Sequence, residues 1–152
     1  MKTFQDFITC SQGLNDSEIT DNKNLVISGT AGGLVMGAVI NMRPDLYHAV
    51  IANVPFVDGI NTMIDETMPL VVGEWEEFGD PRKINGYFYM KGYSPYDNIS
   101  TQQYPNILLE GGLNDSRVKY RDPAKFCAKL REYIKDYMVI YMIRIRKIIQ
   151  YY

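Results

Sequence analysis

The sequence predicts an α/β fold in which a mostly parallel sheet is flanked by helices. Short apolar runs that are typical of buried strands alternate with helical segments, and this alternation is the pattern of a parallel sheet. Two of the runs open into glycine-rich turns, and such sheets place their chemistry at the carboxyl ends of the strands. With 152 residues, 46% hydrophobic and 22% charged, the chain has the length and composition of one globular domain.

The first elements are a helix, a strand and a second helix. A helix over 4–14 collects its apolar side chains near one face and has Gly13 in its last turn. The strand over 24–28 contains three consecutive aliphatic residues, the mark of a buried strand. After a glycine-rich turn, an apolar helix over 34–42 stops before Pro44, because the residue before a proline is disfavoured in a helix.

Five further elements complete the alternation. The strand over 49–54 is closed by a proline, and the helix over 81–91 has a proline near its first turn, where that residue is favoured. A strand over 106–109 opens into a second glycine-rich turn, and an amphipathic helix follows over 122–133. An apolar run over 137–143 is the candidate fourth strand.

Composition argues against several classes of protein. Sixteen basic and 18 acidic residues give a net charge of −2, without the basic excess of a dedicated nucleic-acid binder. No apolar run approaches the roughly 18 residues that span a bilayer, and no secretory signal is visible. Cys10 and Cys127 fit neither a disulfide framework nor a zinc site. We therefore expect a cytoplasmic protein in a reducing compartment, with no metal and no cofactor.

The charge changes abruptly along the chain. Residues 1–136 carry a net charge of −5, whereas residues 137–152 carry three basic residues and no acid. We therefore divide the chain into a partial α/β domain over 1–136 and a basic tail rich in tyrosine and isoleucine over 137–152. The start of that tail, 137–143, has high β-propensity, no charge and no proline, which is typical of a segment prone to self-association. Membrane binding by the tail is disfavoured, because its charges lack a clean helical face.

The segment 65–80 is strongly acidic. It holds six carboxylates and no lysine or arginine. One interpretation is a solvated loop. The other is a pocket for cationic groups, since clustered carboxylates create a negative potential that attracts basic ligands.

The glycine-rich turn 29–33, GTAGG, follows a strand and precedes a helix. A nucleophile elbow, G-x-S-x-G, and a dinucleotide-binding turn, G-x-G-x-x-G, share that setting. This turn completes neither motif. The structural alternative is a tight turn whose glycines let the helix pack on the strand.

The second turn offers an acid at the carboxyl end of a strand. Asp115 follows a glycine pair, and Arg117 lies two residues on. An acid at this place suits the orienting member of a catalytic triad, but it equally suits a turn in which aspartate binds its own backbone. His48 is the only histidine, and it precedes the strand over 49–54, at the edge opposite to the turns. We therefore interpret His48 as a surface residue and not as a general base.

Several motifs together resemble the peptidase domain of the oligopeptidase B group, within the prolyl oligopeptidase family of serine peptidases. The resemblance covers roughly residues 3–134. Its order and spacing of motifs are specific to that family. It rests on the segments SGTAGGLVMGAVINMRPDLYHAVIANVPFVDGINTM, PLVVGEWEEFGDP, GYSPYDNI and YPNILLEGGLNDSRVKYRDPAKFCAKLRE.

The resemblance implies an α/β-hydrolase domain joined to a β-propeller, and cleavage of short peptides after arginine or lysine. It implies that Asp115 is the triad aspartate and that Arg117 holds the substrate backbone. Glu74 and Glu76 match the acidic pair that binds the basic side chain, and carboxylates do pair well with a guanidinium. In an extended loop, residues two apart would also point the same way.

The chain departs from the family pattern at two catalytic positions. The elbow is one residue short and lacks its serine, so Thr30 stands at the nucleophile position and the Ala31 backbone at the oxyanion position. A threonine is stiffer than serine at χ1, and a misplacement of about 1 Å can cost ~10²-fold in rate. The triad histidine is also missing, because the basic tail replaces its region. A gene read in a shifted frame would explain that tail.

Two functional hypotheses follow. In the first, the chain is a truncated serine oligopeptidase, also without propeller and the first half of the hydrolase domain, and inactive alone. In the second, it is a non-catalytic remnant or interaction module that binds short basic peptides through its acidic pocket. In either case half of a parallel sheet leaves an open edge, so we expect self-association.

Overall fold

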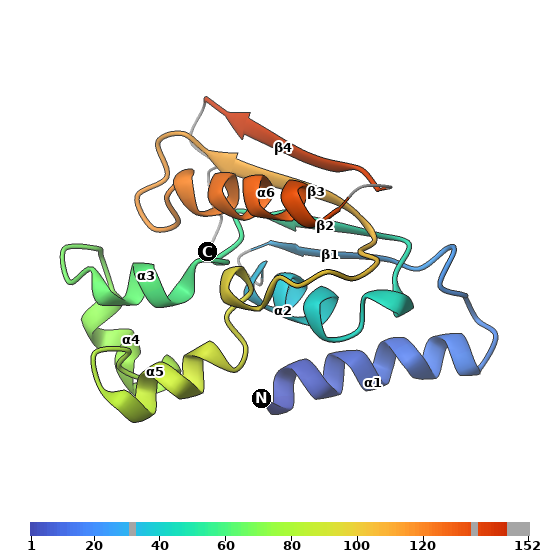
Figure 1. Ribbon diagram of the computed structural model, residues 1–152, viewed down its shortest axis with the longest axis horizontal. Coiled ribbons are helices and arrows are strands. Elements are labelled where there is room, and N and C mark those ends of the chain that lie inside the picture. The colour runs from blue at the N-terminus through green and yellow to red at the C-terminus, as the bar shows by residue number, and fades with distance from the viewer. Residues whose placement is uncertain (31–32, 135–136, 146–152) are drawn as a thin grey trace.

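A computed structural model describes residues 1–30, 33–134 and 137–145 (Figure 1). Four parallel strands form one sheet in the order β1-β2-β3-β4, which confirms the predicted α/β class. In Figure 1 the arrows of β3 and β4 point to the left, so the carboxyl ends of the parallel strands lie on that side, with α3 and α4. The strands are β1 (Val26–Thr30), β2 (Ala49–Asn53), β3 (Asn106–Gly112) and β4 (Val139–Arg144).

In the described residues, helix α1 precedes the first strand, and five further α-helices and two short 3₁₀ turns connect the strands. The four helices expected from the sequence are all present, with ends shifted by a few residues. No helix in this part of the chain is long and apolar enough to cross a membrane. The helices are α1 (Lys2–Asp16), α2 (Gly33–Met42), α3 (Gly59–Ile64), α4 (Val71–Phe78), α5 (Ile84–Lys91) and α6 (Arg121–Tyr133); the 3₁₀ turns are η1 (Pro44–Leu46) and η2 (Tyr96–Asn98).

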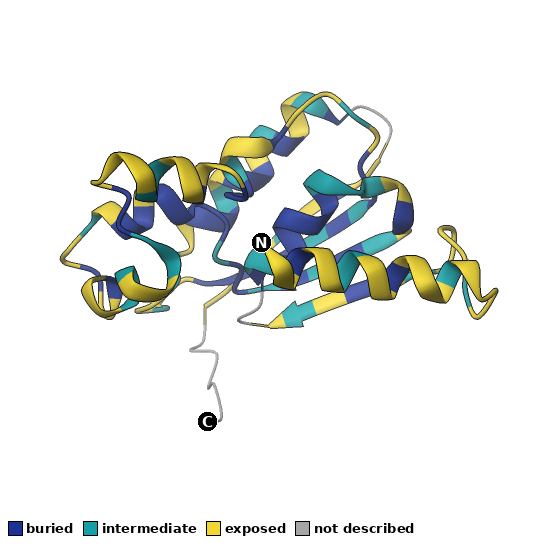
Figure 2. Ribbon diagram, turned by 90° about the horizontal axis from the view of Figure 1, so that it is seen from below, coloured by how far each residue is buried: buried dark blue, intermediate teal, exposed yellow. Residues whose placement is uncertain are grey.

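The core lies between the sheet and its helices. Side chains alternate along a strand, so every second residue faces the same side. One row of four residues in register across the sheet is buried: Ile27, Val50, Ile107 and Val139. Helix α2 contacts β1 and β2, and α6 contacts β3 and β4. Figure 2 shows the resulting concentration of buried residues in α2 and the middle of the sheet.

The opposite face of the sheet is more exposed. Ser28 is exposed, Ile51 and Leu108 are half-buried, and Ile140 is 43% exposed. A parallel sheet is normally covered on both faces, and β1 and β4 here have a neighbour on one side only within the described residues. Self-association through such an edge stays a prediction, which sedimentation velocity at several concentrations would test.

The sheet continues across the charge boundary at residue 136. Strand β4 takes most of its residues from the predicted run 137–143 and pairs with β3. Arg144 Nη2 lies 2.5 Å from Glu110 Oε2, and the Arg131 guanidinium donates to the carbonyl of Val139 at 2.8 and 3.1 Å. The first part of the basic tail is therefore integrated into the fold.

Candidate functional site

The two predicted turns lie at the same edge of the sheet. Thr30 at the end of β1 is in register with Asn53, and Asn53 with Glu110 near the end of β3. The turn after β1 and the loop after β3 therefore open toward the carboxyl side, as the alternation of strands and helices predicts.

Thr30 points away from the helices. Side chains alternate between the two faces along a strand. Ile27 faces the side covered by helices, so Thr30, three residues later, faces the other side. Its Oγ1 accepts a hydrogen bond from Asn53 Nδ2 at 3.2 Å. Ala31, the predicted oxyanion donor, lies outside the described residues. Its role therefore stays a prediction.

Gly33 begins α2 at a point of close contact. A Cβ placed on Gly33 would lie 2.2 Å from Pro55 Cα, far inside van der Waals distance. The helix thus packs directly against the turn after β2. Gly33 therefore has the structural role considered in the sequence analysis, in which the glycines of the turn allow the helix to pack closely.

Replacement of this glycine should destabilise the fold. We expect Gly33→Ala to lower the free energy of unfolding by about 1–3 kcal/mol, because Pro55 must move to accept the new methyl group. Gly13→Ala is the matched control, since its Cβ meets nothing within 4 Å and alanine is favoured in a helix by about 0.5–1 kcal/mol. Urea denaturation of both variants checks the result, and equal midpoints for the two would contradict it.

Asp115 forms a tight turn with its own backbone. Its Oδ1 accepts hydrogen bonds from the backbone N–H of Arg117 at 2.8 Å and of Val118 at 2.9 Å. This is the local turn that the sequence offered as one alternative. The same bonds fix the carboxylate at the carboxyl edge of the sheet, so the turn is compatible with the predicted orienting role as well.

A cavity of about 410 Å³ opens at this edge. It lies between the first turn of α2, the segment after β2, helix α4 and the loop that follows Asp115. Arg117 and Glu74, two of the predicted site residues, both line it. Its charged lining residues in the described part of the chain are Glu74, Glu77 and Arg117, and its apolar ones include Leu34, Val35, Phe56 and Phe78.

Two residues of the cavity wall have strained backbones. Val54 has φ of 49° and Leu70 has φ of 72°, in the left-handed region that β-branched and bulky residues avoid. Both line the cavity. Such strain costs about 1–3 kcal/mol per residue and is concentrated at ligand sites. Its position here supports the cavity as the functional site.

The expectation that Glu74 and Glu76 point the same way is wrong. Both belong to α4 and not to an extended loop. A helix turns about 100° per residue, so residues two apart lie on nearly opposite sides. Glu74 lines the cavity, whereas Glu76 lines a separate hollow with Lys83. The structure therefore brings Glu74 together with Arg117, but it does not bring Glu76 to them.

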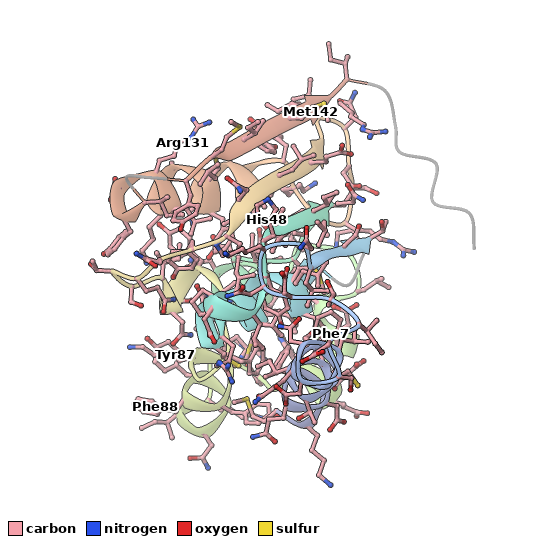
Figure 3. All side chains as sticks on the ribbon, turned by 90° about the vertical axis from the view of Figure 1, so that its right-hand side faces the viewer. Phe7, His48, Tyr87, Phe88, Arg131 and Met142 are labelled. Atoms are coloured by element: carbon pink, nitrogen blue, oxygen red, sulfur yellow. The ribbon has the colours of Figure 1, made fainter. Side chains whose placement is uncertain are left out.

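His48 lies at the opposite edge of the sheet, as expected. It is exposed, and its backbone N–H donates to the carbonyl of Leu25 at 2.8 Å, before β1 begins. Figure 3 views the molecule from the side of these amino ends, where His48 is labelled.

Two buried carboxylates behind the cavity were not expected from the sequence. Asp122 accepts a hydrogen bond from Thr62 Oγ1 at 2.9 Å, and Thr62 also lines the cavity. Asp58 forms an ion pair with Lys125. Nothing in the sequence marks these acids as buried, because each stands at a helix start, where an exposed acid is common.

Burial raises the pKa of Asp122, and the nearby carboxylate of Asp58 adds to this; Thr62, Arg121 and Lys125 oppose it. The unfolded chain then releases the proton of Asp122 at lower pH than the folded chain does. Stability therefore falls as pH rises from about 3.8 through the raised pKa, and the loss persists above it.

We expect Asp122→Asn to raise the free energy of unfolding at pH 7, because burial disfavours the ionised carboxylate. The amide oxygen can still accept the hydrogen bond of Thr62, while the buried charge is gone. The advantage of the variant should vanish near pH 3, where the carboxyl group of the original protein is protonated in both states. Denaturation at both pH values checks this sign, and a variant destabilised at pH 7 would show that the charge itself stabilises the fold.

Comparison with known proteins agrees with this architecture. The model of the prolyl oligopeptidase family matches residues 1–144, through β4. Protease 2 of Moraxella lacunata is 48% identical over 130 residues, which are 85% of this chain and 19% of the relative. Dipeptidyl aminopeptidase BI of Pseudoxanthomonas mexicana is 42% identical over 133 residues, 87% of this chain and 18% of the relative. This chain thus spans about a fifth of the length of the curated relatives it matches.

Solved structures show the same similarity. Oligopeptidase B from Leishmania major is 47% identical with a TM-score of 0.90, over 93% of this chain and 20% of that one. Oligopeptidase B from Trypanosoma brucei, in a closed form with covalently bound antipain, is also 47% identical, with a TM-score of 0.87 over 93% of this chain and 20% of that one. The four parallel strands and their helices are accordingly part of an α/β-hydrolase fold. The chain belongs to the prolyl oligopeptidase family.

Proposed function

We propose that this chain forms part of the catalytic domain of a serine oligopeptidase that cleaves short peptides after arginine or lysine. In this proposal the cavity beside α4 binds the basic side chain, and Asp115 serves as the triad aspartate. Arg117 holds the peptide backbone. Membership of the family supports the reaction type, and the chemistry of the cavity supports the substrate class.

The observation that carries the proposal is the composition of the cavity. Carboxylates from α4 and the guanidinium of Arg117 line one space of about 410 Å³. Carboxylates bind a guanidinium through charge-assisted hydrogen bonds, and a guanidinium in turn can donate to a peptide carbonyl. The apolar residues that line the same space suit the methylene stem of a long basic side chain.

A second candidate is binding without cleavage. Thr30 is not among the described residues that line the cavity, and the only histidine lies at the opposite edge of the sheet. In the described residues, the chain therefore has a place for a basic side chain but brings neither Thr30 nor His48 beside it. In this second candidate the chain would bind basic peptides and release them without cleavage.

A pair of peptides tests the recognition that both candidates share. Fluorescein-labelled Gly-Gly-Arg amide and its citrulline twin differ in charge but hardly in shape. We expect the arginine peptide to bind about tenfold more tightly by fluorescence anisotropy, and Glu74→Gln to remove that preference. Glu132→Gln, at an exposed position of α6, is the matched control and should leave it unchanged. Equal affinity of the two peptides for the original chain would overturn the proposed specificity.

A further inference from the structure

Helix α4 has two distinct faces. Leu70, at its N-cap, together with Val71, Glu74, Glu77 and Phe78, lines the cavity described above. These positions follow the spacing of one helical face. The alternate positions Val72, Trp75, Glu76 and Gly79 line the separate hollow with Lys83.

From this division we infer that Glu77 is the second carboxylate that recognises the basic side chain, and that Glu76 is not. The inference rests on the proposed function, since it names a further specificity-determining residue of the same cavity. Residues three apart on a helix place their Cβ atoms about 5–6 Å apart on one side. Glu74 and Glu77 can therefore both approach one guanidinium or ammonium group. In the described residues neither carboxylate forms an ion pair within 4 Å.

The rotation of α4 about its axis is fixed by Trp75. The indole N–H of Trp75 donates to the carbonyl of Met63 in α3 at 3.0 Å. The guanidinium of Arg82 lies over the indole ring, 3.7 Å from its centre, and is itself held by Asp80 at 2.9 and 3.0 Å. To bring Glu76 into the cavity, the helix would have to turn and break these contacts.

Affinity measurements on three charge-neutralising variants of the full 152-residue chain test the inference. We expect Glu74→Gln to lower the preference for the arginine peptide over the citrulline peptide about tenfold. Glu77 is exposed, so Glu77→Gln should lower it by roughly fivefold. Glu76→Gln is the matched control on the other face and should keep the preference within about twofold of the original. Circular dichroism of each variant confirms that the fold is retained.

The outcomes separate the two proposals. If the original chain prefers arginine and the preference depends on Glu76 but not on Glu77, the assignment of Glu77 is overturned and the proposed function stands. If the original chain has no preference between the two peptides, both are overturned. Loss of the preference in Glu77→Gln with retention in Glu76→Gln supports both.

Discussion

A fluorophosphonate probe should leave the 152-residue chain unlabelled, and hydrolysis of arginine peptides by this chain should be lower by about 10⁶-fold or more than in an enzyme with a complete triad. The probe reacts with a serine or threonine only when a neighbouring base takes up its proton. Thr30 is the hydroxyl at the predicted nucleophile position, and its partner in register is Asn53. His48 lies five residues before Asn53, which corresponds to about 16 Å along an extended strand. The only histidine is therefore far outside hydrogen-bonding distance of Thr30.

A variant with serine at position 30 tests whether the missing serine or the missing histidine prevents labelling. Thr30→Ser should also stay unlabelled, because it restores the primary hydroxyl but adds no histidine. His48→Ala should change nothing, since that residue is at the opposite edge. Labelling of the original chain that disappears in Thr30→Ala would instead show a working nucleophile, and the binding-only candidate would then be rejected.

The sheet could be predicted from the sequence because its signals are local. Apolar runs bounded by glycine or proline identify strands, and all four were placed within a few residues of their observed ends. Within the segment 65–80, the expectation of a loop is wrong for residues 71–78. Its acidic composition is typical of a solvated loop, yet Val71–Phe78 is a helix because Val71 and Trp75 pack against the rest of the molecule. Val71, Trp75 and Phe78 do recur at the spacing of one helical face, but the surrounding carboxylates made a loop the simpler interpretation.

The same helix decides how much of the site could be predicted. The acidic character of the cavity followed from the run of carboxylates, and the loop position of Arg117 followed from the strand before it. The sequence did not show which carboxylates line the same cavity, because the direction of a side chain depends on the secondary structure. Residues two apart lie on the same side of a strand, whereas residues three apart lie on the same side of a helix. The buried Asp122 and its bond to Thr62 join residues 60 positions apart, and no local pattern could reveal that pairing.

Truncation of Phe126 should cause the largest loss of stability, about 3–5 kcal/mol. Phe126 is fully buried in the core, at the middle of α6, which packs on β3 and β4. Phe126→Ala would leave a void almost as large as the phenyl ring. Because protein interiors are close-packed, the surrounding side chains can fill such a void only in part. Urea denaturation measures the loss. Glu132→Ala, at an exposed position of the same helix, should stay within about 0.5 kcal/mol of the original.

This variant also distinguishes support of the fold from recognition of a ligand. Phe126 does not line the cavity in the described part of the chain, so the folded fraction of Phe126→Ala should keep its preference for the arginine peptide at low denaturant and low temperature. Glu74→Gln should show the reverse: its urea denaturation midpoint should be unchanged, and its preference for the arginine peptide should be lost. If Phe126→Ala lost the preference while still folded, α6 would be holding the geometry of the cavity through Asp122 and Thr62, and recognition would then depend on the core of the sheet as much as on α4.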